Sequence, residues 1–113
     1  NSSMKMEIKY KDSSLKNGTA RSYTNNKLTQ EMVFENSTAT VLREYHDNGN
    51  LATELPVNGE AKIFYENGKI KESVPVKNGN REGVGREYDE TGKVIKETLY
   101  RNDKELKKAK KVK

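Results

Sequence analysis

The chain has 113 residues, of which 31% are apolar and 35% are charged, with 22 basic side chains against 17 acidic ones. This length accommodates a single domain, and so low an apolar content excludes a thick two-layer core. The absence of cysteine excludes disulfides and thiolate metal sites. Apolar runs of two or three residues are too short for a membrane-spanning helix.

The net charge of +5 is concentrated at one end of the chain. Residues 103–113 contain six lysines and two acids and contribute +4, whereas residues 1–102 contribute only +1. A nucleic-acid-binding domain carries its basic residues on folded elements, so this distribution argues against a nucleic-acid partner. We expect residues 103–113 to form a basic C-terminal tail, either as a short helix or as a solvated arm that binds polyanions weakly.

An internal repeat orders the rest of the chain. Four tyrosines, spaced 20 to 23 residues apart, are each followed by a turn sequence and then by a branched apolar residue. The tyrosines are Tyr23, Tyr45, Tyr65 and Tyr88, and the apolar residues are Leu28, Leu51, Ile70 and Val94. Residues 17–102 therefore form about four repeats. Residues 1–16 contain one alternating segment and are predicted to be an N-terminal strand or cap.

Alternation with a period of two identifies each repeat as a β-hairpin. Ile70, Val74 and Val76 share one parity, and the residues between them are mostly polar. Asn-Gly and similar pairs supply the positive φ that tight turns need. The predicted repeat turns contain Gly49, Gly59, Gly68, Gly79 and Gly92. The predicted fold is all-β: an antiparallel up-and-down meander of about nine strands, forming one extended, twisted or curled sheet.

Two prolines occupy the same place in neighbouring repeats. Pro56 and Pro75 each lie five residues after the branched apolar residue of their repeat. Because proline cannot donate to the hydrogen-bond ladder, it predicts a bulge or a local gap in strand pairing. Together, the alternation and the low apolar content predict one apolar sheet face with a thin core. An exposed apolar face of this kind typically marks a contact site.

The repeat resembles the bacterial MORN-variant repeat. The resemblance is carried by residues 64–72, FYENGKIKE, followed by Asn78-Gly79 and Gly83, and by residues 86–97, REYDETGKVIKE. It extends over about residues 17–105, with one departure at Val84-Gly85, where a Trp is common. The resemblance implies a β-hairpin repeat fold with a binding role, such as a YwqK-like antitoxin, a protein scaffold or a membrane attachment module. It leaves the bacterial cytoplasm and export after removal of a leader both open.

No constellation of residues predicts catalysis, a bound cofactor or a metal ion. His46, the only histidine, has no neighbours suited to general base catalysis or metal binding, so we expect an exposed turn residue. Three glutamates recur at one stage of the repeat, which indicates a structural role with cross-strand lysines. The glutamates are Glu54, Glu72 and Glu97, and the lysines are Lys69, Lys71, Lys93 and Lys96.

Aromatic and basic residues of the repeats form the candidate binding surface. Its members are Tyr45, Tyr65, Tyr88, Lys69, Lys71 and Lys93. The tyrosines could form a ladder for bases, sugars or a peptide, or each could close the apolar side of its hairpin. We expect a non-catalytic module that binds a protein partner or a second copy of itself. The alternative is a module that binds anionic lipid or a membrane surface through the tail and the repeat lysines.

Overall fold

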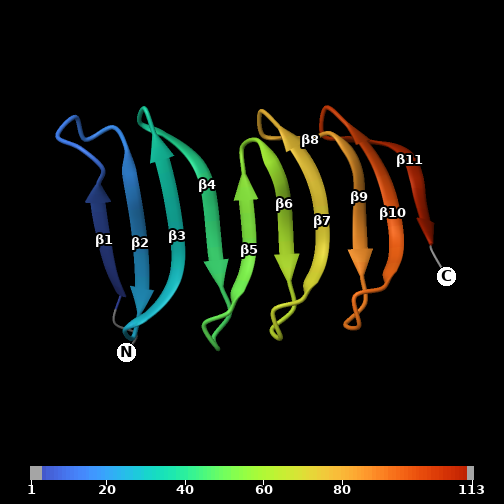
Figure 1. The fold of residues 1–113 in the computed structure, drawn as a ribbon, viewed down its shortest axis with the longest axis horizontal. Helices are drawn as coiled ribbons and strands as arrows, with labels where there is room; N and C mark the ends of the chain where they lie inside the picture. The colour runs from blue at the N-terminus through green and yellow to red at the C-terminus, as the bar shows by residue number, and fades with distance from the viewer. Residues whose placement is uncertain (1–3, 112–113) are drawn as a thin grey trace.

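The computed structural model describes the backbone of residues 4–111 and the side chains of residues 4–106. Within these residues it contains eleven β-strands and no helix (Figure 1). The strands are β1 (Met4–Tyr10), β2 (Gly18–Thr24), β3 (Lys27–Glu35), β4 (Thr38–Tyr45), β5 (Leu51–Pro56), β6 (Gly59–Phe64), β7 (Ile70–Lys77), β8 (Asn80–Arg81), β9 (Gly83–Tyr88), β10 (Val94–Arg101) and β11 (Lys104–Lys111). The meander is therefore confirmed, with more strands than the nine predicted.

The strands form one open antiparallel sheet in chain order, with the short β8 paired to β7 beside the main path. The strands β1 and β11 lie at opposite ends, so the sheet is not curled on itself (Figure 1). The principal dimensions are 48 × 32 × 21 Å and the radius of gyration is 16.4 Å. A compact domain of this size would have a radius near 13 Å, so the molecule is an elongated slab.

The basic tail is neither a helix nor a frayed arm, because residues 104–111 form β11. This strand pairs antiparallel with β10, with register shifts near Leu99. A tight turn connects the two strands, and its residues Asn102 and Asp103 both have positive φ, at 50° and 67°. Without β11, the strand β10 would present a row of unpaired backbone groups, and pairing with the tail satisfies them.

The prolines lie at gaps in pairing, as predicted. The strand β7 pairs with β9 only at Glu72 and Ser73, and pairing on that side resumes with β8 at Val76. The Pro75 carbonyl accepts a hydrogen bond from the amide of Glu82 on this side, where the proline has no N–H to offer. Likewise, β5 pairs with β6 only at Thr53 and Glu54, short of Pro56.

A β-bulge near the start of each repeat shifts the register by one residue. Tyr23, Tyr45 and Tyr88 pair with Leu28, Leu51 and Val94, as the repeat predicts. In the remaining repeat, however, Phe64 and not Tyr65 pairs with Ile70. The alignment of Tyr65 with the other tyrosines was therefore wrong by one position. Tyr65 instead begins the turn that follows the strand. His46 and Asp89 occupy the equivalent position in the neighbouring repeats.

The bulges also place apolar residues on both faces of the sheet. Ile70 lies on the face of Phe64, whereas the next strand pairs put Val74 on the opposite face with Ala61. The prediction of a single apolar face was wrong, because parity cannot be counted through a bulge. The prediction of a thin core is confirmed, since no apolar side chain among the described residues is fully buried.

Candidate binding surfaces

One row of residues crosses the sheet with alternating charge. Each member is the direct cross-strand partner of the next, from β1 to β10. The row, which we name the charge ladder, consists of Glu7, Arg21, Glu31, Arg43, Glu54, Lys62, Ser73, Arg86 and Glu97. We call the face that carries it the ladder face and the opposite side the groove face. Opposite charges directly across strands stabilise a sheet by roughly 0.2–1 kcal/mol per pair.

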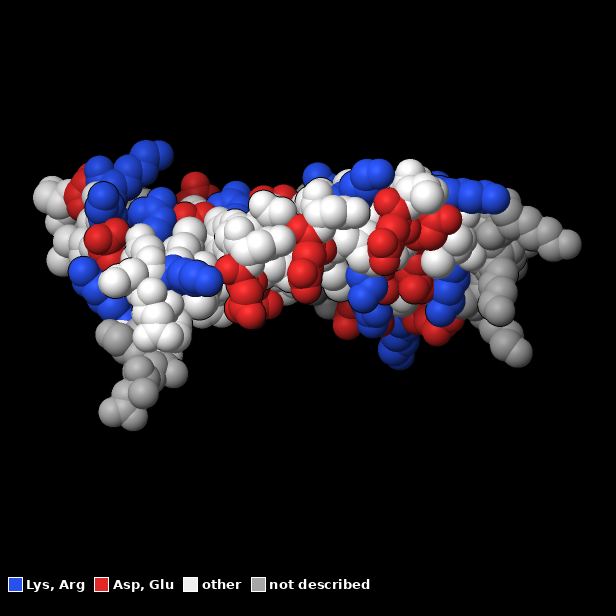
Figure 2. All heavy atoms as spheres, turned by 90° about the horizontal axis from the view of Figure 1, so that it is seen from below, with Lys and Arg blue, Asp and Glu red and all other residues white. Residues whose placement is uncertain are grey.

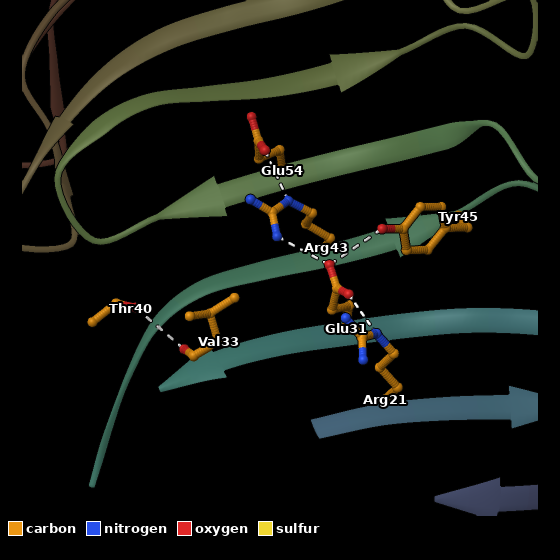
Figure 3. A network of polar contacts seen from close by, with 7 residues as sticks. All are labelled: Arg21, Glu31, Val33, Thr40, Arg43, Tyr45 and Glu54. Carbon is orange, nitrogen blue, oxygen red and sulfur yellow. Dashed lines mark hydrogen bonds and ion pairs between the residues drawn. The ribbon is translucent and has the colours of Figure 1, made fainter. Parts of the chain in front are cut away.

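The ladder is best formed around Glu31 (Figure 3). One of its carboxylate oxygens accepts a hydrogen bond from Arg21 Nε at 2.7 Å, and the other accepts one from Arg43 Nη1 at 3.0 Å. Arg43 then donates from Nε to Glu54 at 2.9 Å, which links four strands in one chain of ion pairs. Burial alone would raise the pKa of Glu31, but the hydrogen bonds from the two arginines outweigh it and lower the pKa.

The ladder follows a rule that can be read in the sequence once the bulges are known. A cation lies two residues before each anchor aromatic residue, and an acid lies three residues after each branched apolar residue. The cations are Arg21, Arg43, Lys62 and Arg86, and the acids are Glu31, Glu54 and Glu97. The fourth acid position holds Ser73. The sequence alone did not predict the ladder, because Tyr65 was aligned with the other tyrosines in place of Phe64. The residue two positions before Tyr65 is Ile63, so Lys62 was not recognised as the cation of that repeat.

The strand register also overturns the proposed set of recurring glutamates. Glu54 and Glu97 are ladder residues, but their partners are Arg43 and Arg86, each at 2.9 Å, instead of the lysines expected. Glu72 lies one position away from the ladder, on the groove face, directly across from Glu87. Of the four lysines, Lys96 forms an ion pair, to Glu87 at 3.3 Å.

The three candidate tyrosines have their hydroxyl groups within reach of neighbouring strands. Tyr45 donates to Glu31 Oε1 at 3.4 Å, and burial followed by the Glu31 charge raises its pKa. Tyr88 reaches back one strand in the same way, to Ser73 Oγ at 3.4 Å. Tyr65 donates to the Tyr88 carbonyl at 2.7 Å. The tyrosines thus join strands and turns, which favours their structural role over an open aromatic ladder.

The candidate lysines gather at one edge of the sheet, the lower edge in Figure 1. Lys69 and Lys93 lie in the turns at 65–69 and 89–93, and Lys71 has its Nζ 5.9 Å from the centre of the Tyr65 ring. Figure 2 shows this edge, where carboxylates are interspersed with the cations. The carboxylates of the lower turns, at 46–50, 65–69 and 89–93, include Asp47, Glu66, Asp89 and Glu90.

The predicted turn glycines divide between the two edges. Gly49, Gly68 and Gly92 lie in the lower turns with φ between 90° and 98°, so they adopt the left-handed conformation that the sequence predicts. Gly59 and Gly79 lie at the upper edge, also with positive φ. A binding surface that included all five would have to span the full length of the strands.

Neighbouring turns at the lower edge are tied together by equivalent residues. His46 Nε2 lies 2.9 Å from the Phe64 carbonyl, and because a carbonyl can only accept, this nitrogen is the donor. Tyr65 makes the same contact one repeat later, to the carbonyl of Tyr88. His46 is therefore a half-buried structural residue, and the expectation of an exposed turn residue was wrong.

Comparison with known families gives one match, to the MORN repeat variant, over residues 41–58, 57–78 and 81–102. Together these segments cover just over half of the chain, and each spans one hairpin around a lower turn. The chain belongs to the MORN repeat variant family. Neither the curated proteins nor the solved structures contain a match. The degenerate first repeat lies outside the matched residues, although it forms the same hairpin of β2 and β3.

The MORN repeats from β5 to β10 enclose a groove on the groove face, with a volume of about 380 Å³. Its apolar lining includes Leu55, Ala61, Ile63, Val74, Val76 and Tyr100. The floor contains Gly85, where an added Cβ would lie 3.0 Å from a Tyr100 ring carbon and 3.2 Å from Val74 Cγ2. Glycine at this place therefore keeps this part of the groove open.

Polar groups border the groove at two ends. Arg81 stacks over the Tyr100 ring at 4.3 Å and donates to Asp103 at 2.7 Å, which lowers the pKa of that carboxyl group. Glu72 and Glu87 lie toward the lower edge.

Among the described residues, no three His, Cys, Asp or Glu side chains come together in a way that could hold a metal ion. The described part of the chain also contains no helix with the length and hydropathy needed to cross a membrane.

Proposed function

We propose that this MORN repeat protein is a non-catalytic binding module whose groove face receives a segment of another protein or of a second copy of the chain. The observation that carries the proposal is the groove between β5 and β10, which has a mainly apolar lining and is open to solvent. Large apolar surfaces that remain exposed on a folded domain typically mark contact sites. An antitoxin-like role would be one form of such binding.

Exposed apolar side chains extend this surface along the groove face. Ile8, Met32 and Leu55 are 46%, 37% and 41% exposed, and the strand pairing places them in one row with Ala20 and Leu42. This row leads directly into Ala61 and Val74 of the groove. A partner could therefore contact several repeats at once, which is how repeat proteins commonly bind.

The charge distribution favours a protein partner over an anionic lipid surface. Lys69 and Lys93, which would face a membrane at the lower edge, share their turns with Glu66, Asp89 and Glu90. Alternating signs of this kind largely cancel the attraction to an anionic surface beyond one Debye length.

The proposal is tested with a pair of substitutions that add a charge on opposite faces. Leu55→Glu places a carboxylate beside the groove, whereas Leu99→Glu, at 37% exposure, does so on the ladder face and serves as the matched control. Analytical ultracentrifugation measures self-association, and affinity capture from the native host followed by binding of the purified partner measures a complex. We expect Leu55→Glu to weaken binding at least tenfold and Leu99→Glu to leave it unchanged. Equal binding by Leu55→Glu and the original protein would contradict the assignment of the groove.

A further inference from the structure

The charge ladder has one step at which a serine takes the place of an acid. Along the row, Glu31 lies between Arg21 and Arg43, whereas Ser73 lies between Lys62 and Arg86. Two cations therefore flank a neutral residue, in strands separated by about 10 Å. The side chains of this step lie on the ladder face, although Ser73 and Arg86 also border the groove from the other side of the sheet. The inference does not rest on the proposed function.

The surroundings of Ser73 reproduce those of the Glu31 carboxylate. Glu31 is held by a cation on the preceding strand, by Arg43 Nη1 on the following strand, and by the hydroxyl of Tyr45 at 3.4 Å. Around Ser73, the corresponding groups are Lys62, Arg86 and the hydroxyl of Tyr88, which lies 3.4 Å from Ser73 Oγ. Ser73 thus has the same kinds of cross-strand neighbours as Glu31, two cations and one tyrosine hydroxyl.

Both cations have N–H groups that donate no hydrogen bond within the described residues. Arg86 uses Nε for Glu97 at 2.9 Å, just as Arg43 uses Nε for Glu54. Arg43 turns its Nη1 to Glu31, whereas the Nη groups of Arg86 have no hydrogen-bond partner among the described residues. The Lys62 ammonium group forms one ion pair within the described residues, to Glu60 at the long distance of 4.0 Å.

We propose that the Lys62–Ser73–Arg86 step of the ladder binds a carboxylate supplied from outside the repeats, such as an Asp or Glu side chain of a partner protein. The serine side chain is shorter than that of glutamate and carries no charge, so the chain itself places no carboxylate between the two cations. A lysine ammonium and the forked N–H donors of an arginine guanidinium can both form charge-assisted hydrogen bonds to a carboxylate. Lys62 and Arg86 are 32% and 44% exposed, which gives the ligand access.

The test uses sodium acetate as the probe, with sodium phosphate and sodium chloride at equal ionic strength as comparison arms. NMR follows the backbone amides of residues 62, 73 and 86 and the Nε–H of Arg86. We expect acetate to produce saturable chemical-shift changes at these groups and chloride to produce none. The absence of a saturable acetate response, or a response to phosphate alone, would overturn the proposal.

Three variants decide whether the response belongs to this step. Ser73→Glu supplies the carboxylate from within the chain, as at Glu31, so the acetate response should be lost. Ser22→Glu adds the same charge on the groove face, where Ser22 pairs with Gln30, and should retain the response. Arg86→Gln, at an exposed position, provides a second test and should weaken the acetate response. An acetate response that survives Ser73→Glu in a folded protein would contradict the proposal.

Discussion

Glu31 shows most clearly how single residues hold this sheet together. Its carboxylate joins three strands through Arg21 and Arg43, in a molecule whose described residues include no fully buried apolar side chain. Cross-strand ion pairs usually add little to stability at a fully exposed surface. Here the Glu31 side chain is only 12% exposed, and it accepts hydrogen bonds from both sides, so its contribution is larger than that of an isolated pair.

Replacing Glu31 should therefore destabilise the protein. We expect Glu31→Gln to lower the free energy of unfolding by about 1 kcal/mol, because two charge-assisted hydrogen bonds become neutral ones. Urea denaturation followed by circular dichroism measures the change. Glu97→Gln is the matched control, since Glu97 is 38% exposed and its side chain contacts Arg86 only among the described residues. An equal loss in both variants would contradict the special role of Glu31.

The same substitution should change the pH dependence of stability. The pKa of Glu31 in the folded protein lies below its ordinary value of 4.5. Its stabilising contribution is therefore complete above that pH and is lost as the pH falls through the folded-state pKa. We expect the stability difference between the original protein and Glu31→Gln to shrink over this interval, in denaturation measured from about pH 7 to about pH 3. A constant difference would contradict the assigned cause.

At the scale of elements, hairpins are joined through their turns as well as through their strands. At the lower edge His46 and Tyr65 each donate to a carbonyl of the next repeat, and at the upper edge Asn58 Oδ1 accepts from the amide of Asn78. Another upper turn is connected in the same way, as Asn17 Oδ1 accepts from Asn36. These contacts fix the spacing of successive hairpins.

Removal of one such contact should loosen the next turn specifically. We expect Tyr65→Phe, which lacks the hydroxyl donor to Tyr88, to speed amide hydrogen exchange at residues 89–93 while the strands remain protected. Tyr23→Phe is the control, because the Tyr23 hydroxyl has no hydrogen bond in the described part of the chain. Unchanged exchange in Tyr65→Phe would show that the contact does not hold the turn.

The elements themselves could largely be predicted from the sequence. Alternation and turn residues locate the hairpins, and the paired prolines locate the gaps in pairing, because both signals depend on local backbone chemistry. Residue positions within the candidate surfaces were harder to predict. Glu72 lies two residues after Ile70, whereas the ladder position lies three residues after it and holds Ser73, and the cross-strand pairing of the bulged strand decides between them.

At the scale of the whole molecule, the open sheet makes the protein quasi-one-dimensional. Each strand contacts its immediate neighbours, and β1 and β11 never meet. Stability in such an array is approximately a sum over repeats and the interfaces between them. The consequence is that loss of a terminal strand should affect the adjacent strand far more than the distant ones.

Deletion of residues 104–113 tests this behaviour. We expect the truncated protein to keep protected amides from β2 to β9, while protection in β10 falls because it becomes an edge strand. Hydrogen exchange monitored by NMR or mass spectrometry distinguishes the two regions. A global loss of protection would show that the sheet folds as one cooperative unit instead.

The sequence by itself determined the repeat, the hairpins and the family to which the chain belongs, because turns and alternation depend on residues that are close together in the chain. Only the tertiary structure decided which side chains share a face, that the basic tail is a strand, and that the sheet stays open. Those features depend on bulges and on pairing between residues far apart in the chain. The charge ladder illustrates both, since its residue types recur in the sequence but its partners are set by the register of the strands.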